Sequence, residues 1–286
     1  MNNSNILKIY SGQYAQTYNE RFLLNPWSKI INDYQLTLLK KLITKDTLWL
    51  DVACGTGYAL SQFPDVERAG FDISTDMLNK AQSENPSAIL FKQGDFRNNY
   101  SDLENKWSIV SCMWGAYCYV ETVKEARIVI LNLISWIKKG GTLFLPVLDI
   151  YDIRPKSNVS YIEPVEVYGG FTKVTSCTWS WIEEGNEIEH FLMSIPLEYI
   201  IEIIKPYFEV IEIKRFRPHE SKNPERVIVA RGKKEIPDSQ PAEIIWGTID
   251  GVQIENNKYT VQNSNYNTSQ NISIINRIKN RLKRLL

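Results

Sequence analysis

The sequence has no surplus of either charge, no long apolar run and little of the chemistry that binds metals. Its 286 residues include 33 Lys and Arg and 33 Asp and Glu, so the formal net charge is zero. Nucleic-acid binding usually needs a basic surplus to neutralise phosphates, which argues against RNA or DNA as a partner. No stretch reaches the 18 apolar residues of a membrane-spanning helix, and the opening MNNSNILKIY lacks the pattern of a signal peptide.

Histidine and cysteine are also scarce. His190 and His219 are the only histidines, which disfavours a histidine-rich metal site. The four cysteines at positions 54, 112, 118 and 177 have no metal-binding spacing, and the first three fall in apolar segments. We therefore expect buried, reduced thiols in a cytoplasmic protein.

Apolar runs alternate with amphipathic ones between Thr47 and Asp149. The expected strands cover residues 47–53, 67–73, 88–95, 107–114 and 142–149, and the expected helices begin at 57, 74 and 122. The last of these helices is expected to extend to the lysine and glycine pairs at 138–141. Apolar strands that alternate with helices predict an α/β fold, in which helices cover both faces of a parallel sheet.

The pattern changes after Asp149. Alternating polar and apolar residues predict an antiparallel hairpin at about 160–195, followed by a helix that starts near Pro196. Residues 208–216 and 225–232 are the last two expected strands, which would close the sheet with one antiparallel strand. These elements predict one domain over residues 1–235.

The C-terminal extension differs in composition from this domain. Residues 236–271 are polar and predict a linker, whereas 272–286 predict a basic amphipathic helix. Such a helix can bind an anionic membrane surface at its periphery, pack on a partner, or only add solubility, and these alternatives stay open.

A glycine-rich loop follows the first expected strand, in LDVACGTG. Glycine at positions 55 and 57 lets the backbone approach a ligand closely at the carboxyl end of a parallel strand. A dinucleotide site would need a third glycine where Leu60 stands, and Asp51 would repel a pyrophosphate. Asp51 would instead suit a cation such as an ammonium group.

The loop is one of four ordered motifs that resemble those of class I S-adenosylmethionine-dependent methyltransferases. The others are AGFDIS, FKQGDF and IVSCMWGAYCYV, each at an expected strand end. The resemblance implies a Rossmann-like fold with a seven-stranded, mostly parallel sheet, an inserted hairpin after strand five, and S-adenosylmethionine as cofactor, released as S-adenosylhomocysteine. It implies cofactor contacts from Asp51 to the amino group, from Asp72 to the ribose and from Asp95 to the adenine. The full set of implied cofactor-binding residues is Tyr14, Tyr18, Asp51, Ala53, Gly55, Gly57, Asp72, Ile73, Met77, Gly94, Asp95, Phe96, Met113 and Trp114.

Several of these residues also have plain structural interpretations. Asp72 could cap the helix that begins near Ser74, Asp95 could begin a turn, and Met113 and Trp114 could belong to the core. The segment IYSGQYAQTYNERF resembles the tyrosine-bearing helix that closes over the cofactor in small-molecule methyltransferases. Its tyrosines at 10, 14 and 18 share one helix face, which could equally be a packing stripe.

The sequence identifies the methyl acceptor less closely than it identifies the cofactor. The catalytic candidates are His190, in the hairpin, and Tyr117, after strand four, although a lone histidine in a strand is more often structural. The metal signature of catechol-type methyltransferases is absent, so no metal is expected. The hairpin resembles the substrate lids of sugar and small-metabolite methyltransferases, where Trp179 and Trp181 could form a wall.

The sequence therefore predicts an enzyme that methylates a nitrogen or oxygen of a small sugar-linked or phosphorylated metabolite. The tail suggests, by analogy, bacterial surface polysaccharide or capsule biosynthesis, with contact at the inner membrane surface. The alternatives are an RNA methyltransferase and a non-catalytic scaffold of this fold. The acceptor and the oligomeric state stay open.

Overall fold

The computed structural model describes residues 3–150, 161–165, 170–174, 177–183, 188–217, 225–239, 252–255 and 258–261. The chain divides into two units, of which the first comprises residues 1–156 and 177–244. In the second unit, β6 (Tyr161–Val165) pairs antiparallel with β7 (Gly170–Val174), and β12 (Val252–Glu255) with β13 (Lys258–Val261). The predicted tail helix at 272–286 lies outside the described residues.

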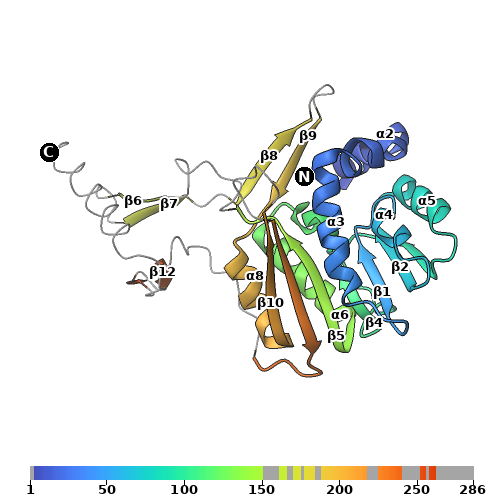
Figure 1. Ribbon diagram of the computed structural model, residues 1–286. Helices are drawn as coiled ribbons and strands as arrows, with labels where there is room; N and C mark the ends of the chain where they lie inside the picture. The colour runs from blue at the N-terminus through green and yellow to red at the C-terminus, as the bar shows by residue number, and fades with distance from the viewer. Residues whose placement is uncertain are drawn as a thin grey trace. The chain divides into compact units, whose positions relative to one another are not determined.

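The first unit is built on a seven-stranded sheet in the order β10-β11-β5-β4-β1-β2-β3 (Figure 1). The strands, in chain order, are β1 (Leu48–Val52), β2 (Glu67–Asp72), β3 (Leu90–Gln93), β4 (Trp107–Ser111), β5 (Ile137–Val147), β10 (Phe208–Phe216) and β11 (Glu225–Lys233). The pairs among β1 to β5 are parallel, whereas β11 runs antiparallel to both of its neighbours. The predicted mostly parallel sheet is therefore confirmed.

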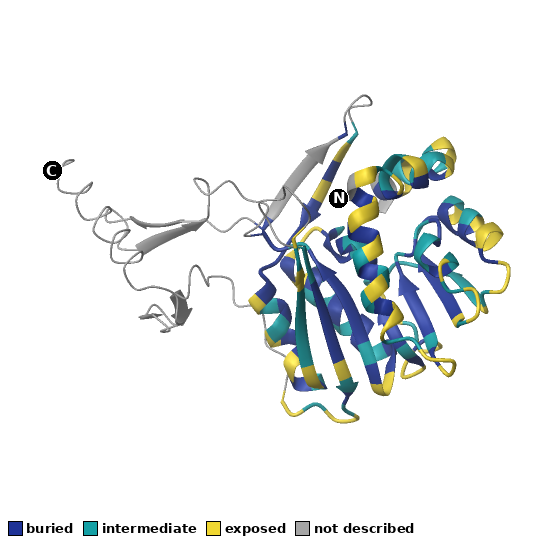
Figure 2. Cartoon of the chain, in the orientation of Figure 1, coloured by how far each residue is buried: buried dark blue, intermediate teal, exposed yellow. Residues whose placement is uncertain are grey.

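Alternate strand residues face two separate cores. Leu50 and Val52 of β1 belong to a core that also holds the buried face of α6 (Val123–Trp136) and α8 (Leu197–Ile204). Trp49, which precedes Leu50 in the strand, belongs to the opposite core, which contains Leu39 of α3 (Pro26–Lys40). The central strands are buried on both faces, as the dark blue strands in Figure 2 show.

The helix caps explain where two of the predicted helices start. The Ser74 hydroxyl accepts from Met77 N at the start of α5 (Thr75–Glu84), and Thr122 and Glu125 form a capping box at the start of α6. The shorter α4 (Tyr58–Ser61) follows the glycine loop.

Two helix predictions were wrong in their bounds. Helix α6 ends at Trp136, because Ile137 takes extended backbone angles and pairs with Trp107 in β5. The register shifts after that pair, and Gly140 at φ 75° accommodates the extra residues in the strand. At the N-terminus, Tyr10 lies in a break between α1 (Asn3–Ile9) and α2 (Gly12–Tyr18), so the three tyrosines do not share one continuous helix.

After β5, β8 (Thr178–Ile182) and β9 (Glu189–Met193) pair antiparallel, as expected for the hairpin. Trp179 and Trp181 lie in β8, but their side chains are not among those the structure describes. No helix in the described part of the chain has the length and apolar composition needed to cross a bilayer.

Candidate functional site

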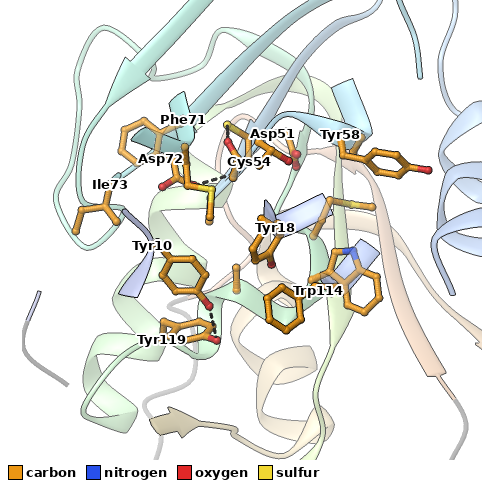
Figure 3. Close-up of a pocket in the computed structure, with 18 of the residues that line it drawn as sticks. Tyr10, Tyr18, Asp51, Cys54, Tyr58, Phe71, Asp72, Ile73, Trp114 and Tyr119 are labelled. Carbon is orange, nitrogen blue, oxygen red and sulfur yellow. Dashed lines mark hydrogen bonds between the residues drawn. The ribbon is translucent and has the colours of Figure 1, made fainter. Parts of the chain in front are cut away.

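A cavity of about 350 Å³ lies at the carboxyl ends of β1, β2 and β4 (Figure 3). Open parallel sheets bind their ligands at this edge. The N-terminal segment contributes Ile6, Tyr10, Tyr14 and Tyr18 to the lining, and α3 contributes Ser28 and Asn32. Chain segments far apart in sequence therefore enclose the site.

The two glycines of the loop after β1 have different surroundings. Gly55 lines the cavity at φ 54°, and a Cβ built there would have no heavy atom within 4 Å. Gly57 does not line the cavity, and its Cβ would lie 2.9 Å from the Ala81 Cβ of α5. Gly55 leaves room for a ligand beside the backbone, whereas Gly57 allows α5 to pack closely.

Two buried carboxylates face the cavity. Asp51 is 1% exposed, and its Oδ1 accepts from the Ser111 hydroxyl at 2.6 Å. Burial raises the pKa of Asp51 to about 7, although the Ser111 hydrogen bond acts in the opposite direction. Asp72 accepts from Gly55 N at 2.8 Å and from Ser74 N at 2.9 Å, so it fixes the loop and the start of α5 together. Burial also raises the pKa of Asp72.

Asp95 follows β3 and is paired within its own turn. Arg97 N donates to Asp95 Oδ1 at 3.0 Å, and the Arg97 guanidinium donates to Oδ2 at 2.7 Å. Arg97 is the only basic side chain among the described residues that line the cavity. The turn interpretation of Asp95 therefore holds, and Asp95 also remains at the cavity edge. A contact between Asp95 and an adenine stays a prediction.

The segment after β4, a 3-10 helix over Met113–Cys118, forms a further part of the wall. Trp114 has φ 58°, unusual for a residue with a side chain, and its indole N–H donates to Asn32 Oδ1 at 2.9 Å. Met113 is 5% exposed and belongs both to the core and to the lining. Tyr117 is fully buried and does not line the cavity; its hydroxyl accepts from Leu148 N at 3.3 Å.

The N-terminal tyrosines pack on one another and also line the cavity. The Tyr10 ring meets that of Tyr14 edge-on with centroids 5.4 Å apart, and that of Tyr18 at 6.0 Å. The Tyr10 hydroxyl donates to the Tyr119 hydroxyl at 2.7 Å (Figure 3). Gly12 N donates to Asp76 Oδ2 at 2.7 Å, which joins this segment to α5.

His190 lies behind the cavity wall rather than in it. It is fully buried on β9, with Nδ1 3.2 Å from the Tyr119 hydroxyl and Nε2 2.6 Å from Glu183 Oε1. Tyr119 lines the cavity, so His190 reaches the site through that hydroxyl.

The structure brings most of the predicted cofactor-binding residues to one cavity. Those that line it are Tyr14, Tyr18, Asp51, Ala53, Gly55, Asp72, Ile73, Met77, Asp95, Phe96, Met113 and Trp114. Gly94 does not line it. A Cβ at this position would lie 2.6 Å from the Tyr100 hydroxyl, so close packing accounts for the glycine.

Asn32 of α3 lines the cavity, but neither the helix nor this residue was among the predictions from the sequence. The signal was present in Asn25 and Pro26, because the Asn25 side chain caps the helix at Ser28 N and Pro26 occupies its first turn.

Comparison with known proteins identifies the family. A family model described as a methyltransferase domain matches residues 50–141. A dTDP-3-amino-3,6-dideoxy-alpha-D-glucopyranose N,N-dimethyltransferase from Streptomyces fradiae is 30% identical over 199 residues, which cover 65% of this chain and 73% of the relative. The chain belongs to the class I S-adenosylmethionine-dependent methyltransferases.

Further relatives agree with this assignment. A dTDP-3-amino-3,4,6-trideoxy-alpha-D-glucopyranose N,N-dimethyltransferase from Streptomyces venezuelae is 35% identical over 96 residues, which cover 33% of this methyltransferase and 39% of the relative. Among solved structures, a Pyrococcus horikoshii protein has a TM-score of 0.54 at 19% identity, covering 78% of this chain and all of that one. An amino pentose methyltransferase from Micromonospora echinaspora has a TM-score of 0.51 at 18% identity, covering 78% and 98%. These two structures support the fold.

The donor set of the cavity fits the cofactor of this family. S-adenosylmethionine has an ammonium group, a ribose with two hydroxyls and an adenine, and it supplies an electrophilic methyl group on a sulfonium. The cavity offers two buried carboxylates and an open glycine backbone, and its described lining has no basic side chain besides Arg97. Such a site favours a ligand that brings its own positive charge.

Proposed function

We propose that this methyltransferase acts on the amino group of a nucleotide-linked amino sugar. The observation that carries the proposal is the 30% identity to the N,N-dimethyltransferase from Streptomyces fradiae over 73% of its length. The relative from Streptomyces venezuelae is named for a substrate of the same class. A role in bacterial surface polysaccharide or capsule assembly, in the cytoplasm and at the membrane periphery, belongs to the same proposal. That role rests on an analogy between residues 272–286 and the basic tails carried by enzymes of bacterial surface-glycan assembly.

We assign the cofactor half of the site as follows. Asp51 pairs with the ammonium group, Asp72 accepts from the ribose hydroxyls, and the Gly55 backbone passes beneath the ligand. Asp72 keeps acceptor capacity for ribose, since its two carboxylate oxygens offer about four lone-pair positions and accept backbone hydrogen bonds from Gly55, Ser74 and Ile73. Phe96 and Ile73 border the same cavity and supply apolar contacts for the adenine and ribose.

A panel of acceptors tests the proposed function. We expect methyl transfer, followed by mass spectrometry, to nucleotide-linked amino sugars and none to the matched hydroxyl sugars. A neutral amine attacks the methyl group directly, whereas a hydroxyl must lose its proton during attack. Turnover of the hydroxyl sugars alone would contradict the nitrogen assignment. Salt-sensitive RNA binding with RNA methylation would instead favour the RNA alternative.

The affinity for S-adenosylhomocysteine should fall as the pH falls through about 7. Because burial raises the pKa of Asp51 to about 7, this carboxyl is ionised above that pH and increasingly neutral below it. Only the ionised form attracts the ligand ammonium, so each further pH unit should weaken binding by up to about tenfold. Calorimetric titration between pH 5.5 and 8.5 measures this slope.

The matched control for this pH dependence is Asp51→Asn. The amide keeps the size of the side chain and removes the titrating charge, so its weaker binding should be nearly flat over the same range. An equally steep slope in Asp51→Asn would exclude Asp51 as the titrating group.

A further inference from the structure

A chain of hydrogen bonds connects the cavity wall to a buried carboxylate. It runs from Tyr119, which lines the cavity, through His190 to Glu183, which follows β8. His190 is fully buried and Glu183 is 4% exposed. The cofactor half of the site uses none of these residues.

The partners of Glu183 fix the direction of the protons. Arg21 donates to Glu183 Oε2 at 2.6 Å in an ion pair, and the Tyr14 hydroxyl donates to Oε1. Glu183 is therefore an acceptor, and His190 Nε2 carries the proton that it donates to Glu183. This leaves His190 Nδ1 as the acceptor, so the Tyr119 hydroxyl donates to it. Tyr119 in turn accepts from the Tyr10 hydroxyl at 2.7 Å.

We propose that this chain is a proton relay that deprotonates the acceptor ammonium before methyl transfer. Tyr119 is the catalytic residue, while His190 and Glu183 are positioning residues that act through it. The inference rests on the proposed function, because an amino sugar binds mainly as its ammonium at neutral pH. In Figure 3, Asp51 and Asp72 lie at one end of the pocket and Tyr119 at the other, so the phenol and the two carboxylates border the same cavity from different elements.

The proton balance of the step is simple. An N–H bond of the ammonium breaks and an O–H bond forms on Tyr119, while the original Tyr119 proton moves to His190 Nδ1. The substrate becomes a neutral amine with its lone pair free. The positive charge moves to the imidazolium, whose Nε2–H faces the Glu183 carboxylate. As in a nucleophile–histidine–carboxylate triad, a hydroxyl passes its proton to a histidine that a carboxylate orients. Here the hydroxyl is a phenol.

The surroundings of His190 keep the ring neutral before the reaction. Burial lowers the pKa of His190 and the nearby Arg21 charge lowers it further, while Glu183 raises it. The phenols of Tyr10, at 6.0 Å between ring centroids, and Tyr119, at 6.2 Å, also face the ring. Once the ring is protonated, Glu183 is the group that stabilises it.

The first test compares Tyr119→Phe with wild type over a range of pH, using an amine acceptor from the panel. The variant should lose on the order of 10²-fold in kcat at pH 7, the usual scale of one general base. The defect should shrink by about tenfold per pH unit as the pH rises, because solution then supplies the free amine. A structural role would give a defect that is the same at every pH. Tyr207→Phe is the control, since it removes a half-buried phenol that does not line the cavity.

Two further variants separate positioning from packing. Glu183→Gln keeps the shape but loses the charge, and His190→Gln replaces the imidazole by an amide that can hydrogen-bond but cannot take up the proton. Both should lower kcat more than they raise KM, with the same recovery at high pH. Calorimetric titration measures the affinity for S-adenosylhomocysteine, which should be the same in His190→Gln as in wild type.

A second measurement needs no acceptor. The chain has only His190 and His219, so ¹⁵N-histidine NMR with His219→Gln as a reference assigns the His190 ring. We expect a neutral Nε2–H tautomer at pH 7, with Nδ1 unprotonated. An Nδ1–H tautomer, an imidazolium at pH 7, or a defect in Tyr119→Phe that does not vary with pH would overturn the relay alone. If wild type methylates no amine, the proposed function fails, and this inference fails with it.

Discussion

Replacing Asp72 by alanine should weaken binding of S-adenosylhomocysteine by about 1–3 kcal/mol, which is about 5- to 150-fold in Kd. Asp72 accepts from Gly55 N and Ser74 N, so its loss removes the anchor of the loop as well as the proposed contact with the ribose. Hydrogen bonds to a charged acceptor are stronger than neutral ones, and a buried N–H without an acceptor adds a further cost. Calorimetric titration at pH 8 measures the effect directly.

Asp72→Asn and Glu67→Ala are the comparison variants. Asp72→Asn keeps an acceptor but loses the charge, so its affinity should fall between wild type and Asp72→Ala. Burial raises the pKa of Asp72, which means that the ionised carboxylate is costly in the ligand-free protein. The asparagine variant should therefore lose little thermal stability, although its affinity for S-adenosylhomocysteine falls. Glu67 is exposed at the opposite end of β2, and Glu67→Ala should bind normally. An unchanged Kd in Asp72→Ala would refute the ribose assignment.

Replacing Gly57 by alanine should lower the free energy of unfolding by about 2–4 kcal/mol. The backbone has φ 71°, which costs a residue with a side chain about 1–2 kcal/mol. The new Cβ would also lie 2.8 Å from Asn85 Nδ2, 2.9 Å from Ala81 Cβ and 3.2 Å from Ala81 Cα, and α5 must shift to relieve this contact. Differential scanning calorimetry and urea unfolding measure the loss.

Gly55→Ala is the matched control, because it adds the same methyl group two residues earlier. Its φ of 54° carries a similar backbone cost, but its Cβ would have no heavy atom within 4 Å. We expect Gly55→Ala to be the more stable variant of the two and to show the larger loss of cofactor affinity relative to its loss of stability. Equal losses of stability would contradict the different roles assigned to these glycines.

The sequence predicted most of the residues that share this cavity, because they are local to strand ends. Asp51, Asp72 and Asp95 each follow a run of apolar residues, and parallel strands bring their carboxyl ends to one edge. Once the strands are correct, the position of these side chains follows from topology. The resemblance of the four motifs then indicated the cofactor, and the relatives agree with that family.

Predictions from the local sequence were wrong where tertiary packing determines whether a residue lines the cavity. Gly94 matched a motif, yet its missing side chain makes room for Tyr100 and Phe71. Tyr117 and Tyr119 are two residues apart, but only Tyr119 lines the cavity, because a 3-10 turn with Trp114 and Gly115 at positive φ directs the segment. No periodicity in MWGAYCYV predicts such a turn.

The sequence by itself determined the class of fold and the acids that the strand ends bring to one cavity. Strand periodicity and the order of motifs along the chain carry that information. Only the tertiary structure decided that Tyr119, His190 and Glu183 form one chain of hydrogen bonds beside Tyr10, Tyr14 and Arg21. These residues come from the N-terminal helices, the segment after β4 and the hairpin. Contacts such as Tyr119–His190, 71 residues apart, and Tyr14–Glu183, 169 residues apart, depend on how those segments pack, which no local pattern encodes.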